Sequence, residues 1–171
     1  MDSKPSSVTS HMPPKRQEIQ HAEDFVSVMR EAIREAEKGW LAGEVPVGAI
    51  LMDQSNGIVA RAHNRCVLDV DPTAHAEIVA IRQAARIYQN YRLPGATLVV
   101  TVEPCIMCMG AIMNARIDML VFGTFDEKSG AGGSLFNLPE DRRLNHRLKV
   151  IHGILEEECR GLMQGFFTEK R

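Results

Sequence analysis

The feature that most constrains this chain is a pair of short motifs, His-x-Glu and Pro-Cys-x-x-Cys, separated by about one helix and one strand. The first motif places His75 two residues before Glu77, and the second supplies Cys105 and Cys108. One imidazole and two thiolates are ligands that zinc prefers, and together they neutralise its charge. Because both motifs fall at expected helix starts, a fold that brings these starts together would form a metal site. The rest of the chain is then interpreted as its support.

The number of ligands indicates what kind of metal site this is. Three protein ligands leave the fourth position of a tetrahedral zinc ion to water, whose pKa falls from about 15.7 toward about 7. Glu77 is then suitably close to carry the proton of that water. The alternative is a closed structural site with His63, His146 or His152 as fourth ligand, in which Glu77 has no task. We expect a catalytic site with one zinc ion per chain.

Length and composition indicate one folded domain. The chain has 171 residues, 44% of them hydrophobic and 25% charged, which allows a substantial core. No apolar run approaches the roughly 18 residues that cross a bilayer, and the N-terminus lacks an apolar secretion signal. We therefore expect a cytoplasmic protein with no membrane partner. Four cysteines, two of them in the Cys-x-x-Cys, suit a metal better than a disulfide framework.

The net charge of −2 argues against a cationic nucleic-acid binder of the usual kind. Any RNA contact would need a local basic patch. The best candidate is the C-terminal third, which contains Arg142, Arg143, Arg147, Lys149, Arg160, Lys170 and Arg171. Such charges are more often simply a solvated surface.

The chain divides into a tail and a domain. Residues 1–20 are rich in Ser, Pro and Lys and lack periodic apolar residues, which predicts a disordered N-terminal tail. Residues 21–171 form the single domain. Apolar periodicity predicts helices over 21–40, 72–88, 104–116 and 155–167, and strands over 45–52, 58–62, 96–102, 119–123 and 149–154, with a hairpin turn at Asn56-Gly57. This alternation predicts an α/β domain whose sheet is covered on both faces.

The two metal motifs resemble those of the zinc-dependent deaminases of bases and nucleosides. Segments within and beyond these motifs are similar to the bacterial tRNA-specific adenosine deaminases, and the resemblance covers residues 22–171. These segments are Glu-Val-Pro-Val-Gly-Ala at 44–49, Asn64-Arg65, Asp-Pro-Thr-Ala-His-Ala-Glu at 71–77, Asn-Tyr-Arg-Leu at 90–93, Glu-Pro-Cys-Ile-Met-Cys at 103–108, Gly-Ser-Leu at 133–135, Asn-His-Arg at 145–147 and Phe166-Phe167.

This resemblance implies a three-layer, cytidine-deaminase-like fold with a central mixed five-stranded sheet flanked by helices on both faces. It also implies hydrolytic deamination of the wobble adenosine in a tRNA anticodon to inosine. The base would be turned out of the anticodon stem-loop and attacked by water at C6, with Glu77 as proton shuttle. A homodimer is implied as well. The alternatives are a deaminase of a free base such as guanine or cytosine, and a zinc-stabilised RNA-binding module.

Four further residues are expected at the substrate by the same resemblance. Asn64 matches a family residue that hydrogen-bonds the adenine edge, and Val47 matches one that packs against the base. Asp126 aligns with a position near the RNA sugar, and Phe167 with residues of the C-terminal helix near the anticodon loop. Without the resemblance, Asn64 reads as a turn residue after the second strand.

Three residues depart from the family pattern, and one apolar cluster has two interpretations. Met109 and Gly132 stand where Ala is usual, and Phe125 stands where a small or polar residue is usual. These departures bear on the shape of the pocket rather than on the reaction. The cluster fits either a dimer seam or an ordinary helix core, and it consists of Met107, Met109, Ile112 and Met113.

Overall fold

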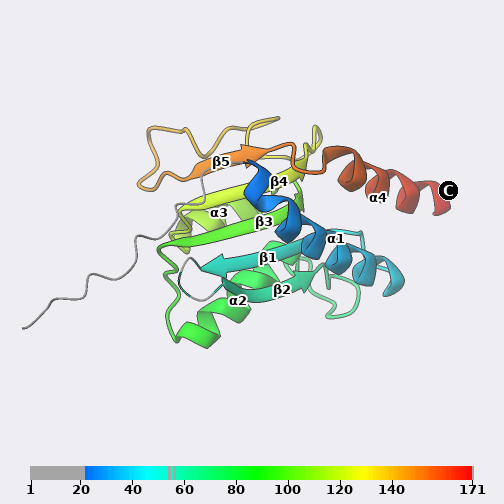
Figure 1. Cartoon of the computed structure of the whole chain (residues 1–171), viewed down its shortest axis with the longest axis horizontal. Coiled ribbons are helices and arrows are strands. Elements are labelled where there is room, and N and C mark those ends of the chain that lie inside the picture. Colours follow the sequence, from blue (N-terminus) through cyan, green and yellow to red (C-terminus); the bar gives the residue numbers. More distant parts are fainter. Residues whose placement is uncertain (1–21, 54, 56, 171) are drawn as a thin grey trace, which may run out of the picture.

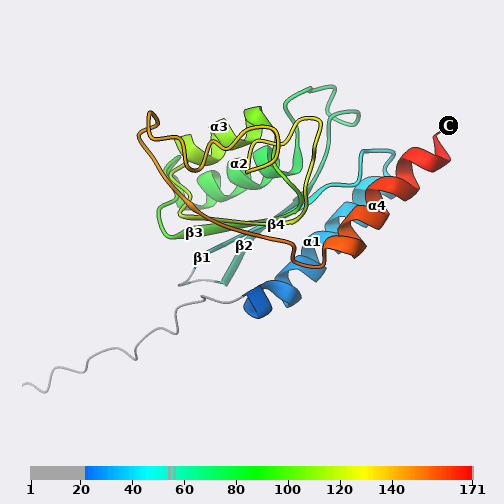
Figure 2. The same ribbon diagram turned by 90° about the horizontal axis from the view of Figure 1, so that it is seen from above.

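Helices cover both faces of one mixed, five-stranded sheet, as expected for the three-layer α/β architecture (Figure 1 and Figure 2). This computed structural model describes residues 22–53, 55 and 57–170. The tail expected over 1–20 and Asn56 of the expected turn lie outside the described residues. The expected start of the domain at residue 21 stays a prediction.

The sheet has the strand order β2-β1-β3-β4-β5. Its strands are β1 (Gly48–Asp53), β2 (Gly57–His63), β3 (Ala96–Val102), β4 (Met119–Thr124) and β5 (Lys149–His152). Strand β1 is antiparallel to β2 and β3, whereas β3, β4 and β5 are parallel. Every residue of the central strand β3 is buried, which is why its sequence is a continuous β-branched and apolar run. Gly57 begins β2 with a φ of +70°, a conformation that suits the hairpin turn.

The helices form the two outer layers. They are the short 3-10 helix η1 (Ala22–Phe25), α1 (Val26–Leu41), α2 (Ala76–Tyr88), α3 (Ile106–Asn114) and α4 (Glu156–Glu169). Helices α2 and α3 lie on one face of the sheet, and α1 and α4 lie on the other (Figure 2). Ala76, Ala80 and Ala84 recur at every fourth position and are buried along α2. Within the described part of the chain, no helix is long and apolar enough to span a membrane.

Two apolar cores lie on the two faces of the sheet. The core beneath α2 and α3 contains Leu98 and Phe122 together with three residues of the cluster proposed as a dimer seam. Met109, Ile112 and Met113 are buried there, so for these three the seam prediction is wrong and the helix-core interpretation is correct. They are spaced three and four residues apart, so they share the face of α3 that packs against the sheet.

The two helices that follow the metal motifs both begin later than the sequence predicts. The second was expected from Pro72, but α2 begins at Ala76 because residues 71–75 form a turn. In this turn the backbone N–H of Thr73 donates to the Asp71 carboxylate, and the N–H of His75 donates to the carbonyl of Thr73. The third helix begins at 106 rather than 104. Both shifts leave a metal-ligand candidate in the N-cap position.

Candidate metal centre and active site

The two helix starts bring the three expected ligands together. His75 is the N-cap of α2, Cys105 is the N-cap of α3, and Cys108 lies in the first turn of α3. The Nδ1 atom of His75 is 3.7 Å from the Cys105 Sγ and 3.5 Å from the Cys108 Sγ. Tetrahedral zinc with Zn–S of about 2.3 Å and Zn–N of about 2.1 Å would separate these atoms by about 3.6 Å. The ligand set and its spacing therefore fit a zinc ion.

The alternative of a closed structural site is not supported. Among the described residues, the group of possible metal ligands at this site has three members and no fourth. The Nδ1 of His63 is 3.1 Å from a carboxylate oxygen of Glu35, and the Nε2 of His146 is 2.8 Å from the Ile117 carbonyl. His152 stacks on aromatic rings. Three protein ligands leave room for water or substrate.

The pKa values of the three candidate metal ligands shift in different directions. The hydrogen bond with Cys108 lowers the pKa of Cys105 to about 4, with a further contribution from His75. The same bond raises the pKa of Cys108, and the bond with Cys105 raises that of His75. Cys105 is therefore held as the thiolate, the form that binds metal, at the positive end of a helix.

Glu77 lies in the first turn of α2, close to this group, and is only 3% exposed. Its Oε2 atom is buried without a hydrogen-bond partner among the described residues. Burial raises the pKa of its carboxyl group to about 6. A buried oxygen without a partner is costly and calls for a functional explanation. Glu77 can exchange a proton near neutral pH, as a general acid–base group must.

A cavity of about 300 Å³ opens beside the ligand group. Its lining includes six of the eight site residues expected from the sequence: Val47, Asn64, His75, Glu77, Cys105 and Asp126. Cys108 is fully buried in the first turn of α3. Phe167 is 48% exposed and lies outside this cavity, whereas its neighbour Phe166 lines it. Phe167 instead lines a neighbouring hollow of about 470 Å³, together with Asp126 and Arg160.

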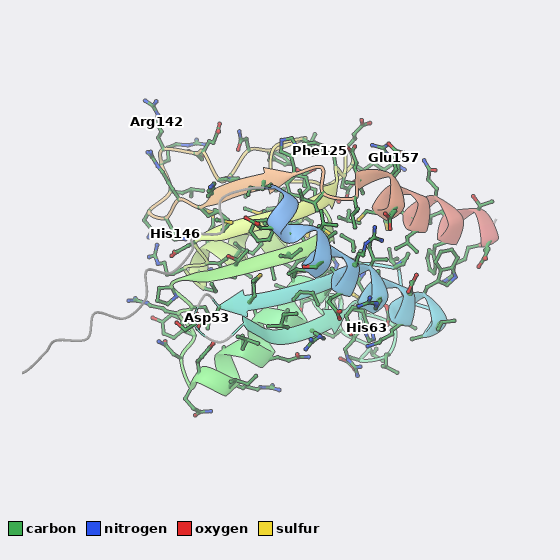
Figure 3. The ribbon with its side chains drawn as sticks, in the orientation of Figure 1. Asp53, His63, Phe125, Arg142, His146 and Glu157 are labelled. Carbon is green, nitrogen blue, oxygen red and sulfur yellow. The ribbon has the colours of Figure 1, made fainter. Side chains whose placement is uncertain are left out.

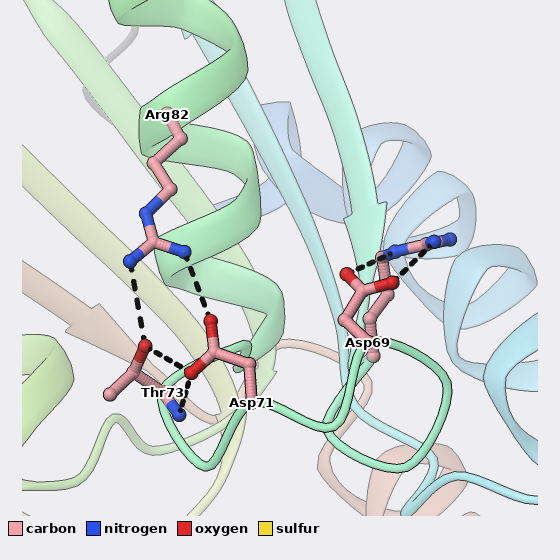
Figure 4. Close-up of polar contacts among 5 residues, drawn as sticks. Asp69, Asp71, Thr73 and Arg82 are labelled. Atoms are coloured by element: carbon pink, nitrogen blue, oxygen red, sulfur yellow. Dashed lines mark hydrogen bonds and ion pairs between the residues drawn. The ribbon is translucent and has the colours of Figure 1, made fainter.

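Hydrogen bonds and ion pairs brace the loop that leads into α2 (Figure 4). The Asp71 carboxylate accepts from the N–H of Thr73 at 2.8 Å and from its hydroxyl at 2.7 Å, and Arg82 of α2 approaches it to 3.4 Å. Arg65 donates to both carboxylate oxygens of Asp69, at 2.9 and 2.8 Å. The loop therefore presents its metal ligand from a braced backbone.

Several residues that line the cavity were not singled out from the sequence. Two are buried carboxylates, Glu44 and Glu103, which accept backbone hydrogen bonds from distant loops. Met163 reaches the cavity from α4. Lys170, at the C-cap of α4, also lines the cavity, and the sequence singles it out only as part of a basic patch. Glu44 and Glu103 stand in family-like segments, but the sequence gives no sign of which amides they meet.

The three departures from the family pattern have separate environments. Met109 lies in the apolar core rather than in the cavity. Phe125 packs on Phe122 and His152, with ring centroids 5.0 and 4.8 Å apart, and lines the neighbouring hollow. The backbone N–H of Gly132 donates to Glu103 at 2.8 Å.

The basic residues of the C-terminal third do not form one patch. Arg142 and His146 lie at one end of the sheet, and Phe125 and Glu157 lie at the other (Figure 3). Lys170 lines the cavity, and Arg160 lines the neighbouring hollow. Arg171 lies outside the described residues.

Comparison with known proteins identifies the class that this fold and site define. Residues 22–124 match the model of the family described as "cytidine and deoxycytidylate deaminase zinc-binding region". The match includes His75, Glu77, Cys105 and Cys108. The chain belongs to this zinc-binding deaminase family.

Individual relatives confirm the narrower resemblance drawn from the sequence. A protein named tRNA-specific adenosine deaminase from Haemophilus influenzae is 48% identical over 144 residues, covering 84% of this chain and 83% of the relative. One of the same name from Bacillus subtilis is 48% identical over 143 residues, covering 84% and 88%.

Solved structures share the fold. One from a study of A-to-I editing by tRNA:A34 deaminases at the wobble position superposes with a TM-score of 0.76 at 40% identity, covering 78% of this chain and 96% of that one. A guanine deaminase from Nitrosomonas europaea has a TM-score of 0.71 at 20% identity, covering 98% and 100%, which shows the fold alone.

Proposed function

We propose that this chain converts the wobble adenosine of a tRNA anticodon to inosine by hydrolytic deamination. The proposal rests on one observation: Asn64 and Glu77 line the same cavity as the candidate metal ligands His75 and Cys105. The names of relatives at 48% identity favour adenosine in tRNA over other substrates of this chemistry.

The chemistry follows from the donor set and the buried carboxylate. His75, Cys105 and Cys108 would hold one zinc ion, which when bound makes a water molecule acidic enough to attack near neutral pH. Glu77 takes one proton from the attacking water and transfers it to a ring nitrogen as the C–O bond forms at C6 of adenine. It then moves the remaining proton from the new C6 hydroxyl to the amino nitrogen, and the C6–N bond breaks. Adenosine and water therefore give inosine and ammonia.

Recognition of the base would use the remaining walls of the cavity. The amide oxygen of Asn64 is committed to the backbone N–H of Ala76 at 2.8 Å, so its NH₂ group is the end offered to an acceptor on the adenine edge. Val47 and Asp126 line the same cavity. We expect Val47 to pack against the base and Asp126 to lie near a ribose hydroxyl. A stacked base could not reach this depth, so the nucleotide has to turn out of the loop.

The hollow beside the cavity would receive a neighbouring nucleotide of the anticodon loop. It shares Asp126 and Met163 with the cavity and adds the exposed ring of Phe167. An exposed aromatic ring stacks on a base of any sequence. Lys128 and Arg160 line the hollow together with three acidic residues, and Arg160 is paired with Glu156 and Glu157. Lys128 is therefore the charge that we expect to meet the RNA backbone.

We also propose that residues 21–171 act as one deaminase domain that forms a homodimer. Because Met109 and its buried neighbours cannot form the seam, the outward side of α3 is the remaining candidate. There Ile106 is 51% exposed and Met107 is half-buried. Ile106→Lys should convert a dimer to a monomer in analytical ultracentrifugation, and an unchanged dimer would place the interface elsewhere.

The experiment that tests the proposed function compares substrates with one zinc-loaded preparation. An anticodon stem-loop with adenosine at the wobble position should be converted, whereas free adenine, guanine and cytosine should not. Turnover of a free base without RNA turnover would support the alternative function. Elemental analysis should give about one zinc per chain. Binding of RNA without any turnover in zinc-loaded protein would leave only an RNA-binding module.

A further inference from the structure

Two buried carboxylates line the cavity without belonging to the metal group. Glu44 is 2% exposed and Glu103 is 3% exposed. We propose that both are positioning residues: each anchors one loop wall of the cavity through backbone amides, and together they fix its width. The inference rests on the proposed function, because the width matters for the base that enters.

Glu103 gathers three amides from one loop. Its Oε1 accepts from the N–H groups of Gly132 at 2.8 Å and Ser134 at 2.9 Å, and its Oε2 accepts from the N–H of Asp126 at 3.0 Å. The loop 126–134 therefore folds around a single carboxylate. Asp126 and Ser129 of this loop line the cavity. Moving the carboxylate would move that wall.

The close approach of this loop to Glu103 also supports the proposed anchoring. A Cβ atom at Gly130 would lie 2.2 Å from the Glu103 Oε2 and 2.4 Å from the Ser134 Oγ, so a larger residue would have to displace these side chains. The N–H of Ala131 also donates to the carbonyl of Pro104 at 2.8 Å. Because Pro104 precedes Cys105, this wall is tied directly to a metal ligand.

Glu44 has the corresponding place on the other wall. Its Oε1 accepts from the N–H groups of Val67 at 2.8 Å and Leu68 at 2.9 Å, in the loop that follows β2. Cys66 and Val67 of that loop line the cavity. In the strand order, β2 and β1 lie on one side of β3 and β4 lies on the other. The two carboxylates therefore anchor walls that come from opposite sides of the sheet.

Glu103 and Glu44 differ in how many carboxylate oxygens accept hydrogen bonds, so different substitutions can test each one. Glu103 uses both oxygens, so Glu103→Gln would turn an NH₂ group toward a backbone N–H, donor against donor. Glu44 uses one oxygen for both amides, so Glu44→Gln can keep both bonds. Glu44→Met has a similar length and offers no oxygen. We expect Glu103→Gln and Glu44→Met to disturb their walls and Glu44→Gln to preserve its wall.

Backbone hydrogen exchange tests the inference without reference to substrate. Glu103→Gln should speed exchange at the amides of Asp126, Gly132 and Ser134 but not at Val67. Glu44→Met should do the reverse. Both variants should retain about one zinc per chain. Unchanged exchange at the amides facing the substituted residue would overturn the inference, and so would loss of zinc.

Kinetics on the wobble stem-loop gives the second readout. Because buried amides lose their acceptor, kcat/KM should fall about 10- to 100-fold in Glu103→Gln and Glu44→Met, while Glu44→Gln restores most of it. The pH profile of kcat should keep its shape, since neither residue carries the transferred proton. Full activity in both disrupting variants, or a shifted profile, would contradict a positioning role.

Two glycine variants keep the inference testable if the carboxylate variants do not fold. Gly130→Ala should reproduce the Glu103→Gln exchange pattern, because the added methyl group displaces the same carboxylate. Gly161→Ala, on α4, meets nothing within 4 Å and serves as the control with normal exchange and activity. If wild-type protein fails to convert the stem-loop, the proposed function fails, but the exchange patterns still decide the positioning role.

Discussion

The side-chain oxygen of Asn64 accepts a hydrogen bond from the backbone N–H of Ala76 at 2.8 Å. The residue that follows β2 thereby caps the helix that carries Glu77 and begins beside His75. Under the proposed function, one amide group has two tasks: its oxygen fixes the helix start, and its nitrogen would donate to the base.

These two tasks of Asn64 can be separated by substitution. Asn64→Asp keeps an acceptor for Ala76 but loses the NH₂ donor, so kcat/KM on the stem-loop should fall about 10- to 100-fold with little change in stability. Asn64→Ala loses both, so the free energy of unfolding should fall by about 1 kcal/mol as well. Denaturation and kinetics on the same samples check this. An Asp variant with full activity would remove Asn64 from base recognition.

Glu77 should be needed for turnover and dispensable for the metal. Glu77→Gln keeps the size of the side chain but cannot accept a proton, so kcat should fall about 10²- to 10⁴-fold. Elemental analysis should find the same zinc content as in wild-type protein, because the ligands are elsewhere. A Gln variant that remains fully active would disprove the role of Glu77 as proton carrier.

The buried Glu35 gives a pH dependence that does not involve the metal group. Burial tends to raise the pKa of Glu35, but its hydrogen bonds with Lys38 and His63 outweigh this and lower the pKa below 4.5. A lowered folded-state pKa means that Glu35 stabilises the fold above the unfolded pKa and loses this effect as pH falls through the folded value.

Glu35→Gln should therefore cost about 1 kcal/mol of unfolding free energy at about pH 7, and the difference from wild type should shrink toward about pH 3. Urea denaturation at both pH values measures this. A difference that grows in acid would show that the sign is wrong.

The basic residues lie in separate places, and we expect those beside the cavity to contact RNA. Lys128→Gln with Lys170→Gln removes two charges beside the cavity and hollow. Binding of the stem-loop should weaken, and the slope of log K against log salt should become shallower by about 1 per lost phosphate contact.

Arg142 lies at the other end of the sheet (Figure 3), and Arg143 follows it in the sequence. Arg142→Gln with Arg143→Gln removes the same charge and is the matched control. This pair should have the smaller effect. The opposite ranking would move the RNA path to the far end of the domain.

The metal centre could be predicted because each of its candidate ligands lies in a short motif of neighbouring residues. His75 and Cys105 stand at helix starts, where two short motifs fix both the residue type and its place. The inward face of α3 could not be predicted, because α3 is apolar around most of its surface and periodicity cannot say which side packs against the sheet. Burial of Met109 answers that question only once the sheet is in place.

The walls of the cavity depend on contacts between distant parts of the chain. Glu103 meets amides up to 31 positions away, and Glu44 meets amides up to 24 positions away. Backbone N–H groups are alike along the chain, so no pattern of side chains shows which of them a carboxylate will contact. Which helix residue lines the cavity is similarly hard to predict: Phe166 lines it and Phe167 lines the hollow beside it, and the expected contact of Phe167 with RNA stays a prediction.

The most direct test of the central claim is a position-resolved measurement on one RNA. A stem-loop with adenosine at the wobble position and at other loop and stem positions is incubated with zinc-loaded protein, and inosine is mapped by sequencing. Our account predicts inosine at the wobble position and none in the paired stem. Absence of inosine from this RNA, with conversion of free guanine or cytosine by the same preparation, would contradict it.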